Sequence, residues 1–198
     1  MDAYSARPGV FRVVTVPPIQ YLMVDGHGDP NTSAGYTAAI EAIYPVAYKL
    51  KFASKNDGRD YAVMPLEALW WSDDMAAFTS ARDKSRWDWT LLNMVPDWVT
   101  SDDFDQAVAA VRARGAPDAL GRVRLATLDE GLAVQVMHVG PYDDEAAVLD
   151  EMHTVFIPGN GLEMTGQHHE VYLSDVRRVE PAKLRTLLRQ PVVRTASA

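Results

Sequence analysis

Two short runs near the start of the chain have the composition of β-strands. Residues 11–16 are rich in β-branched side chains and are followed by Pro17 and Pro18, and residues 20–24 are again mostly apolar. Runs of this kind, bounded by turn residues, are typical of strands. Residues 25–30 consist of glycine, aspartate, histidine and proline, a composition that predicts a loop.

After this loop the spacing of apolar positions changes to that of a helix. Apolar side chains recur every three or four residues, at Tyr36, Ile40, Ile43, Ala47 and Leu50. This spacing predicts a helix that buries one face. Pro45 lies inside the pattern. Because an interior proline costs about 3 kcal/mol, we expect a kink or a break there.

Residues 61–71 and 87–95 have the pattern of two long strands, separated by a polar segment of mixed charge at residues 72–86. A second helix is predicted to begin near Thr100, since capping residues and two aspartates follow one another there. We expect Phe104, Val108 and Val111 to form its buried stripe, and Gly115 to end it.

The last third of the chain repeats the alternation of strands and helices. Strands are predicted at residues 123–128 and 132–139, on either side of a turn at residues 129–131. A helix over residues 144–156, a loop at 158–161 and a strand at 168–173 follow. A short C-terminal helix is predicted from Pro181, because proline suits the first helical position.

The order strand, strand, helix, strand therefore occurs twice, and residues 21–28 align with residues 133–140 so that each final glycine precedes a helix. We predict one α+β domain over residues 1–198, with pseudo-repeat halves of about residues 8–99 and 100–192. The duplicated β-α-β-β half-domains would form a curved antiparallel sheet with helices on one face and a ligand groove on the other.

Composition narrows the classes of function. The chain has 198 residues, 47% of them hydrophobic, which suits a globular protein with a sizeable core. Its net charge of −8 argues against nucleic-acid binding, which depends on lysine and arginine. It has no cysteine, no signal-like N-terminus and no apolar run long enough for a membrane span. We expect a cytoplasmic protein without a membrane partner, and nothing in the sequence indicates an oligomer.

Two strand carboxylates stand out among aromatic residues. Alternation along a strand places Glu67 on one face with Leu69 and Trp71, and Glu170 on one face with His168 and Tyr172. A carboxylate among apolar groups is desolvated, which makes it a candidate general base or a counter-ion for a cationic ligand. The alternative for each is a solvated glutamate on the open face of an antiparallel sheet.

Four tryptophans lie close together in the sequence, at Trp70, Trp71, Trp87 and Trp89. Burial in the core is the simpler explanation, and we expect it for at least two of them. A tryptophan cluster also suits a pocket for planar hydrophobic ligands, and we expect Trp71 and Trp87 to face the groove.

The sequence gives little support to metal or nucleotide chemistry. His168 and His169 are adjacent, so their side chains point to opposite faces of a strand and do not easily chelate one ion. His138 is expected to be a sheet residue. The chain has no HExxH, GxSxG or Walker motif, and we expect neither a metal nor a cofactor.

Several motifs together resemble the stand-alone GyrI-like proteins over nearly the whole chain. They are the C-terminal run at residues 168–178 with residues 181–192, and the segments at residues 65–71, 95–97 and 130–142. One departure is Val176, where the family pattern has a proline. The resemblance implies a duplicated β-α-β-β fold with a ligand groove between its halves. Related proteins include drug-sensing domains of transcription regulators, a DNA gyrase inhibitor, and hydrolases of cyclopropane-containing DNA-alkylating compounds.

Two functions of different class follow from this resemblance. The first is detoxification, in which the protein hydrolyses the cyclopropane ring of a flat hydrophobic compound and Glu67 activates water with help from Glu170. Tyr172 or Tyr142 would donate a hydrogen bond to the developing oxyanion. The alternative is a module that binds or senses hydrophobic, planar or cationic small molecules without chemistry. The sequence offers nothing specific for a third function, gyrase inhibition. The expected catalytic residues are Glu67, Glu170 and Tyr172, and the expected ligand-binding residues are Trp70, Trp71, Trp87, Trp89, His138, Tyr142 and His168.

Overall fold

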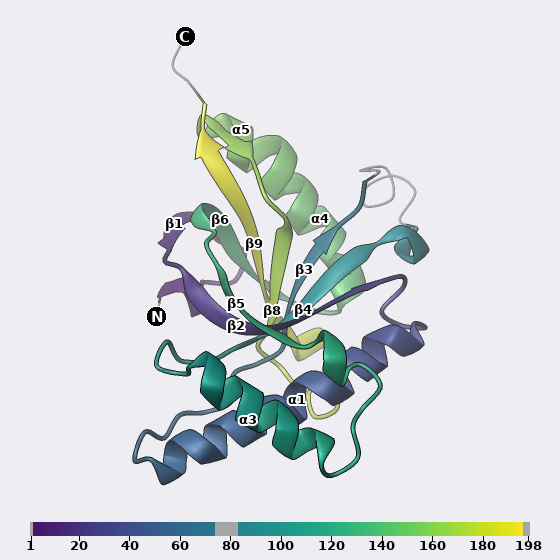
Figure 1. Cartoon of the computed structure of the whole chain (residues 1–198). Helices are drawn as coiled ribbons and strands as arrows, with labels where there is room; N and C mark the ends of the chain where they lie inside the picture. Colours follow the sequence, from purple (N-terminus) through teal and green to yellow (C-terminus); the bar gives the residue numbers. More distant parts are fainter. Residues whose placement is uncertain (1, 74–82, 196–198) are drawn as a thin grey trace. The chain divides into compact units, whose positions relative to one another are not determined.

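The computed structural model describes residues 2–73 and 83–195 (Figure 1). The chain divides into two compact units. Residues 19–128 form one unit, which we call the central unit. Residues 1–18 and 129–198 form the other, which contains both chain ends and which we call the terminal unit.

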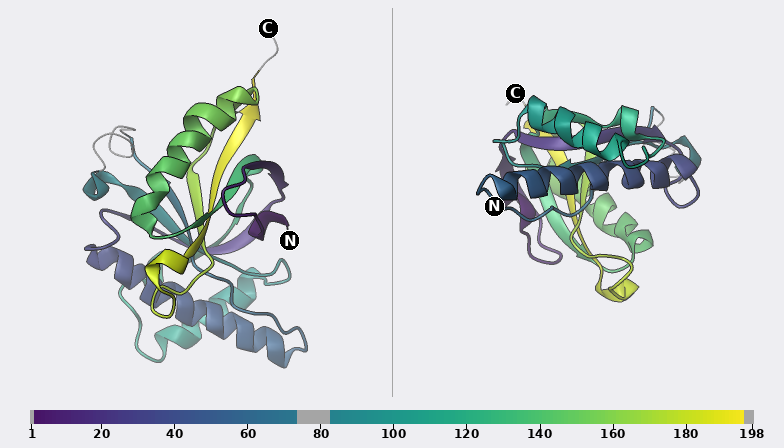
Figure 2. Two further views of the ribbon diagram at one scale, coloured as in Figure 1. Left: turned by 180° about the vertical axis from the view of Figure 1, so that it is seen from behind. Right: turned by 60° about the horizontal axis from the view of Figure 1, so that its bottom comes forward.

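The central unit is an antiparallel sheet with two helices. Its strand order is β3 (Glu67–Trp71), β4 (Asp88–Met94), β2 (Ile19–His27) and β5 (Arg124–Leu128). Helices α1 (Ala34–Asn56) and α3 (Ser101–Arg112) lie side by side (Figure 2). The buried face of α1 includes Ile43, Val46 and Leu50, as the apolar spacing of its sequence requires.

The terminal unit is an antiparallel sheet covered by one irregular helical segment. Its strand order is β1 (Arg12–Val16), β6 (Gly131–Val139), β9 (Arg185–Arg194) and β8 (His168–Tyr172), and the short strand β7 (Leu162–Met164) also pairs with β9. The helical segment comprises α4 (Glu145–Asp150), a π-helical stretch (Glu151–Phe156) and α5 (Ile157–Gly159). It begins after a 3₁₀ turn at Tyr142–Asp144.

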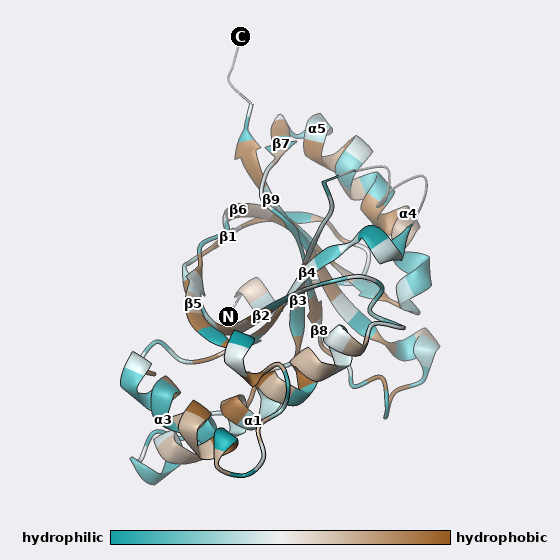
Figure 3. Cartoon of the chain, turned by 45° about the vertical axis from the view of Figure 1, so that its right-hand side comes forward, coloured by the Kyte–Doolittle hydropathy of each residue, from teal (hydrophilic) through white to brown (hydrophobic). Residues whose placement is uncertain are grey.

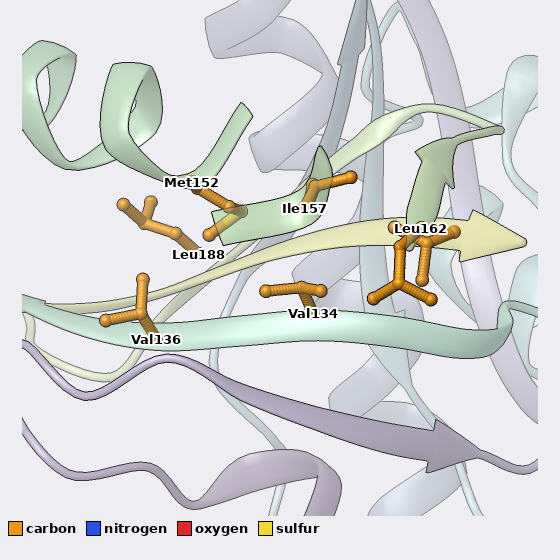
Figure 4. Close-up of a cluster of buried hydrophobic side chains, with 7 residues drawn as sticks. Val134, Val136, Met152, Ile157, Leu162 and Leu188 are labelled. Atoms are coloured by element: carbon orange, nitrogen blue, oxygen red, sulfur yellow. The ribbon is translucent and has the colours of Figure 1, made fainter. Parts of the chain in front are cut away.

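The core of the terminal unit lies between this sheet and the helical segment. Its buried members are Val134, Val136, Met152, Ile157, Leu162, Leu188 and Val192 (Figure 4). Met152 and Ile157 come from the helical segment, and Val136 and Leu188 are register partners on β6 and β9. The face of the sheet that carries Leu188 is therefore the face that meets the helices.

The two units do not coincide with the predicted pseudo-repeat halves. β1 pairs with β6 in the terminal unit, and β5 pairs with β2 in the central unit. The first strand of each half thus completes the sheet built by the other half. The pseudo-repeat remains a prediction about the order of elements along the chain. The two compact units are instead defined by which strands pair with one another.

Most predicted elements are present, with different boundaries. β2 continues to His27, so part of the predicted loop at residues 25–30 is strand. The predicted strand at residues 61–71 is reduced to β3, and most of the predicted polar loop, residues 74–82, lies outside the described residues. Thr100 caps α3 in a capping box with Asp103, as its sequence indicated.

Two predictions about helices need correction. α1 does not break at Pro45 and continues to Asn56, because the tertiary contacts of its buried face outweigh the loss of one backbone hydrogen bond. A kink at Pro45 stays a prediction. The C-terminal helix expected from Pro181 is only a 3₁₀ turn at Pro181–Lys183, and the next residues form β9. β9 buries seven consecutive residues, Thr186 to Val192, against neighbours on both sides.

The α+β class and the antiparallel sheet pairing are confirmed. The helices carry hydrophobic and hydrophilic residues on different sides, as amphipathic helices do (Figure 3). Within the described residues, no helix combines the length and the apolar character that crossing a bilayer requires.

Candidate functional site

The first predicted carboxylate, Glu67, is completely buried at the start of β3. Its register partner on β4 is Leu92, and Glu67 is 0% exposed. The hydroxyl of Tyr21 on β2 donates a hydrogen bond to Glu67 Oε2 over 3.3 Å, and Tyr21 is equally buried. Glu67 is therefore part of a buried tyrosine–glutamate pair in the central unit.

Three of the four predicted tryptophans pack on the α1 side of the central sheet. Trp70 stacks on Tyr36 of α1 with ring centroids 6.2 Å apart, and Trp89 meets the same tyrosine edge to face at 5.1 Å. Trp87 contacts Trp70 edge to face at 5.7 Å. Since adjacent strand residues alternate, Glu67 lies on the face opposite to Trp70. Of the four tryptophans, Trp71 alone shares the face of Glu67. We expected Trp87 to face the groove together with Trp71, but it packs against Trp70 on the α1 side.

Trp89 also depends on a glycine. A Cβ atom at Gly26, its register partner, would lie 2.0 Å from the indole ring, so any larger residue would displace the ring. The indole Nε1 donates to the carbonyl of Gly28 over 3.2 Å. These contacts show that Trp89 is a core residue. Ligand binding by Trp70, Trp71, Trp87 and Trp89 stays a prediction.

The second predicted carboxylate, Glu170, lies on the helical side of the terminal sheet. Its register partner is Leu188, which belongs to the core beneath the helical segment. We expected the ligand groove on the face without helices, so the position of Glu170 on the helix-covered face differs from the expected position of a groove residue. Strand alternation identifies the residues that share a face, but it does not identify the face that the helices cover.

Glu170 and Tyr172 form a second tyrosine–glutamate pair. The Tyr172 hydroxyl donates to Glu170 Oε2 over 2.7 Å, and the Glu170 side chain is 14% exposed. The ring of Tyr142 meets Tyr172 edge to face with centroids 5.5 Å apart. Three predicted site residues, Glu170, Tyr172 and Tyr142, are thus in contact in one unit.

Tyr142 is suited to donate a hydrogen bond. Burial raises its pKa to about 12, and the negative charges of Glu145, Glu170 and Asp175 act in the same direction. The phenol therefore stays protonated at neutral pH. Tyr142 is 37% exposed and is therefore accessible to solvent.

The predicted histidines have separate roles. His168 Nε2 lies 3.5 Å from Glu170 Oε1, so it belongs to the Glu170 cluster. His138 is buried, and its Nε2 lies 3.1 Å from the carbonyl oxygen of Pro141, across the turn at Gly140. A side chain at Gly140 would crowd the His138 ring, and the glycine has a φ of 147°. His138 stabilises this turn, in line with its expected place in the sheet.

A buried charged network on the opposite face of the terminal sheet was not predicted. Glu130 accepts from Arg189 Nη1 over 2.6 Å and lies 2.9 Å from His169 Nδ1. Burial would raise the pKa of Glu130, but His169 and Arg189 outweigh it and lower the pKa to about 2. Arg189 also donates to the backbone carbonyl of Ala3. The sequence signal for this network was weak: Arg189 lies between the apolar pairs Leu187–Leu188 and Val192–Val193.

Neither cluster has the composition of a metal centre. Among residues 2–73 and 83–195, no group of three or more histidine, aspartate or glutamate side chains is arranged to hold a metal ion. The chemistry available in the Glu170 cluster is that of one carboxylate, two phenols and an imidazole, which can transfer protons and donate hydrogen bonds.

Comparison with known proteins identifies the family. The profile of the GyrI-like small-molecule-binding domain matches residues 10–193. The chain is similar to an uncharacterized conserved protein from Listeria innocua, with 37% identity, a TM-score of 0.87 and coverage of 97% of this chain and 96% of that one. It is also similar to a hydrolase from Listeria innocua, with 37% identity, a TM-score of 0.82 and coverage of 97% and 95%.

A more distant likeness supports the fold alone. The C-terminal domain of EcmrR is 15% identical, with a TM-score of 0.59 and coverage of 94% of this chain and 98% of that one. No protein with a curated description matches the sequence at a significant level. Because the family profile covers nearly the whole chain, the chain belongs to the GyrI-like small-molecule-binding domain family.

Proposed function

We propose that this protein is a cofactor-independent hydrolase that opens the cyclopropane ring of flat, hydrophobic alkylating compounds. The observation that carries the proposal is the Glu170–Tyr172 pair, in which a carboxylate is oriented by a phenol 2.7 Å away. The similarity to a Listeria hydrolase at 37% identity supports a hydrolytic reaction. Detoxification would be the biological consequence.

In this proposal Glu170 is the general base. Both glutamates have a tyrosine partner, but Glu67 is 0% exposed and Glu170 is 14% exposed. A general base that activates water for attack on a ligand must be reachable by the water and by the ligand. The greater exposure of Glu170 therefore favours Glu170 over Glu67 as the base. The Tyr172 hydroxyl already donates a hydrogen bond to Glu170 Oε2, so the role of Tyr172 is to orient the carboxylate.

Tyr142 is the proposed donor to the substrate. Its raised pKa, about 12, keeps its proton in place, and its ring lies beside Tyr172. A protonated phenol next to the site can stabilise an oxyanion that develops on the substrate.

The proposed reaction adds one water across a strained carbon–carbon bond. Glu170 takes a proton from water while the water oxygen bonds to the methylene carbon of a spirocyclopropyl dienone. The carbon–carbon bond of the strained ring breaks, and its electron pair moves through the conjugated system to the carbonyl oxygen. Tyr142 hydrogen-bonds to this phenolate, which then receives the proton held by Glu170. The product is a phenol with a hydroxymethyl group.

The decisive experiment is incubation with a spirocyclopropyl-dienone alkylator in water enriched in ¹⁸O. We expect a ring-opened product, formed faster than in buffer, that carries one ¹⁸O in its hydroxymethyl group. Turnover no faster than in buffer, or product without the label, would refute hydrolysis by this protein.

Binding without chemistry is the second candidate. The cluster of a carboxylate with the edge-to-face rings of Tyr142 and Tyr172 is an arrangement that also attracts flat cations. Calorimetry with a planar cationic dye would then give stoichiometric binding, and mass spectrometry would recover the dye unchanged.

A further inference from the structure

His168 has an unusual environment, because both of its ring nitrogens are buried although the residue itself is only partly so. Its side chain is 10% exposed, and neither ring nitrogen makes a hydrogen bond within the part of the chain that the structure describes. An unsatisfied buried polar group costs about 1–3 kcal/mol. Such groups are rare in native proteins, and some of those that occur have a catalytic role.

The charged group beside His168 is the carboxylate of Glu170. His168 Nε2 lies 3.5 Å from Glu170 Oε1, while Tyr172 occupies Glu170 Oε2 at 2.7 Å. The two carboxylate oxygens therefore have different neighbours, a phenol on one side and an imidazole on the other. All three side chains project from the same face of β8, because they are two residues apart.

A second histidine supports the ring of His168 from the helical segment. His153 belongs to the π-helical stretch, and its ring meets His168 edge to face with centroids 6.2 Å apart. π-helical turns are rare and frequently occur at functional sites. Burial, with a smaller effect of His168, lowers the pKa of His153 to about 4, so His153 is neutral at pH 7 and packs without adding charge.

We infer that His168 is a positioning residue for Glu170, and that His153 in the π-helical stretch holds the His168 ring in place. The imidazole limits the rotation of the carboxylate about its last torsion, so that one oxygen stays directed at the water that it activates. This inference rests on the proposed hydrolase function for its catalytic consequence. The contact between His168 and Glu170 can be tested without it.

The kinetic test compares two substitutions of His168. His168→Phe keeps a ring without nitrogen, and His168→Gln keeps a polar group of similar reach. We expect His168→Phe to lower kcat about 10- to 100-fold, as small misplacements of catalytic groups do, with KM changed by less than about threefold. His168→Gln should recover a substantial part of the loss. An unchanged kcat, or equal losses in both variants with normal folding by circular dichroism, would overturn the inference.

A thermodynamic cycle tests the contact itself, whether or not the protein turns over a substrate. Melting temperatures are measured for His168→Phe, Glu170→Gln and the double variant. We expect the double variant to shift less than the sum of the single shifts. Additive shifts would refute the contact, whereas coupling in a protein without turnover would refute only the proposed reaction. The matched control is the cycle for His27 and Asp88, an exposed histidine–carboxylate pair 2.8 Å apart, where we expect additivity.

Discussion

Two tyrosine–glutamate pairs in the described part of the chain, Tyr21–Glu67 and Tyr172–Glu170, lie one in each unit, and their surroundings differ. Glu67 and Tyr21 come from different strands and are both completely buried, with 3.3 Å between their oxygens. Glu170 and Tyr172 come from the same strand, lie 2.7 Å apart and are partly exposed beside Tyr142 and His168. A tyrosine and a glutamate thus form a core contact in the central unit and part of a partly exposed polar cluster in the terminal unit.

Under the predicted alignment of the pseudo-repeat halves, the strand registers place the two pairs at different positions. When residues 21–28 are aligned with residues 133–140, Met23 corresponds to Gln135. The residues paired in register with Met23 across the central sheet then correspond to those paired with Gln135 across the terminal sheet. In the central unit the paired residues are Met23, Leu92 and Glu67. In the terminal unit they are Gln135, Arg189 and His169. His169 therefore occupies the place that corresponds to Glu67, and Glu170 corresponds to Ala68 on the helical face. The likeness between the two glutamates is one of composition and not of position.

The largest expected difference between the pairs is in turnover. Replacing Glu170 by glutamine removes the proposed base and should lower kcat by about 10²- to 10⁴-fold. Replacing Glu67 by glutamine should change kcat by less than about tenfold, because Glu67 is fully buried in its contact with Tyr21. Glu163→Gln, at an exposed position on β7, is the matched control. Stopped-flow absorbance of the dienone measures all three, and the reverse order of losses would assign the chemistry to Glu67.

The second expected effect concerns His169, the counterpart of Glu67, whose charge partner is Glu130. The folded pKa of Glu130, about 2, is below its unfolded value of 4.5. Its contribution to stability is therefore fully present above pH 4.5 and is lost as the pH falls toward 2. At about 1.4 kcal/mol for each pKa unit, the loss is about 3 kcal/mol.

Urea unfolding between pH 6 and pH 2.5 measures this loss. Glu130→Gln should be less stable than the wild type at pH 6 and should show a flatter decline with acid. Glu163→Gln, which changes an exposed carboxylate, should keep the wild-type slope. If Glu130→Gln also keeps that slope, other carboxylates control acid unfolding.

The third effect is in stability at neutral pH. Glu67→Ala removes the acceptor of a buried hydroxyl and leaves a cavity, which should lower the free energy of unfolding by about 2–4 kcal/mol. Glu170→Ala, at a partly exposed site, should cost about 1 kcal/mol. Chemical denaturation of both variants gives the comparison, and equal losses would contradict the different burial of the two pairs.

The sequence predicted the local features of this fold well and the long-range features poorly. The strand at residues 11–16, the capping of α3 at Thr100 and the helix that follows Tyr142 are set by neighbouring residues, and each is present. β9 was missed because its charged residues, Arg185 and Arg189, conceal a strand that is buried by its partners on both sides. Strand pairing between distant segments decides such cases, and local patterns do not record it.

The candidate site followed the same division. Alternation correctly grouped His168, Glu170 and Tyr172 on one face of a strand, because that depends only on backbone geometry. It did not reveal that this face meets the helical segment, nor that Tyr142 would contact Tyr172. The network of Glu130 with residues 169 and 189 joins three distant parts of the chain, so no spacing in the sequence could indicate it.

The smallest expected effect separates the two tyrosines. Tyr21→Phe and Tyr172→Phe each remove one hydroxyl that donates to a glutamate. Removing the buried Tyr21 hydroxyl should cost about 1–2 kcal/mol of unfolding free energy and leave kcat unchanged. Tyr172→Phe should cost less than about 1 kcal/mol, since the Glu170 side chain is partly exposed, but should lower kcat about tenfold because Glu170 loses its orientation. Denaturation and kinetics on the same preparations would show this crossed pattern. A kcat loss in Tyr21→Phe of the size seen in Tyr172→Phe would mean that burial does not separate the two pairs in function.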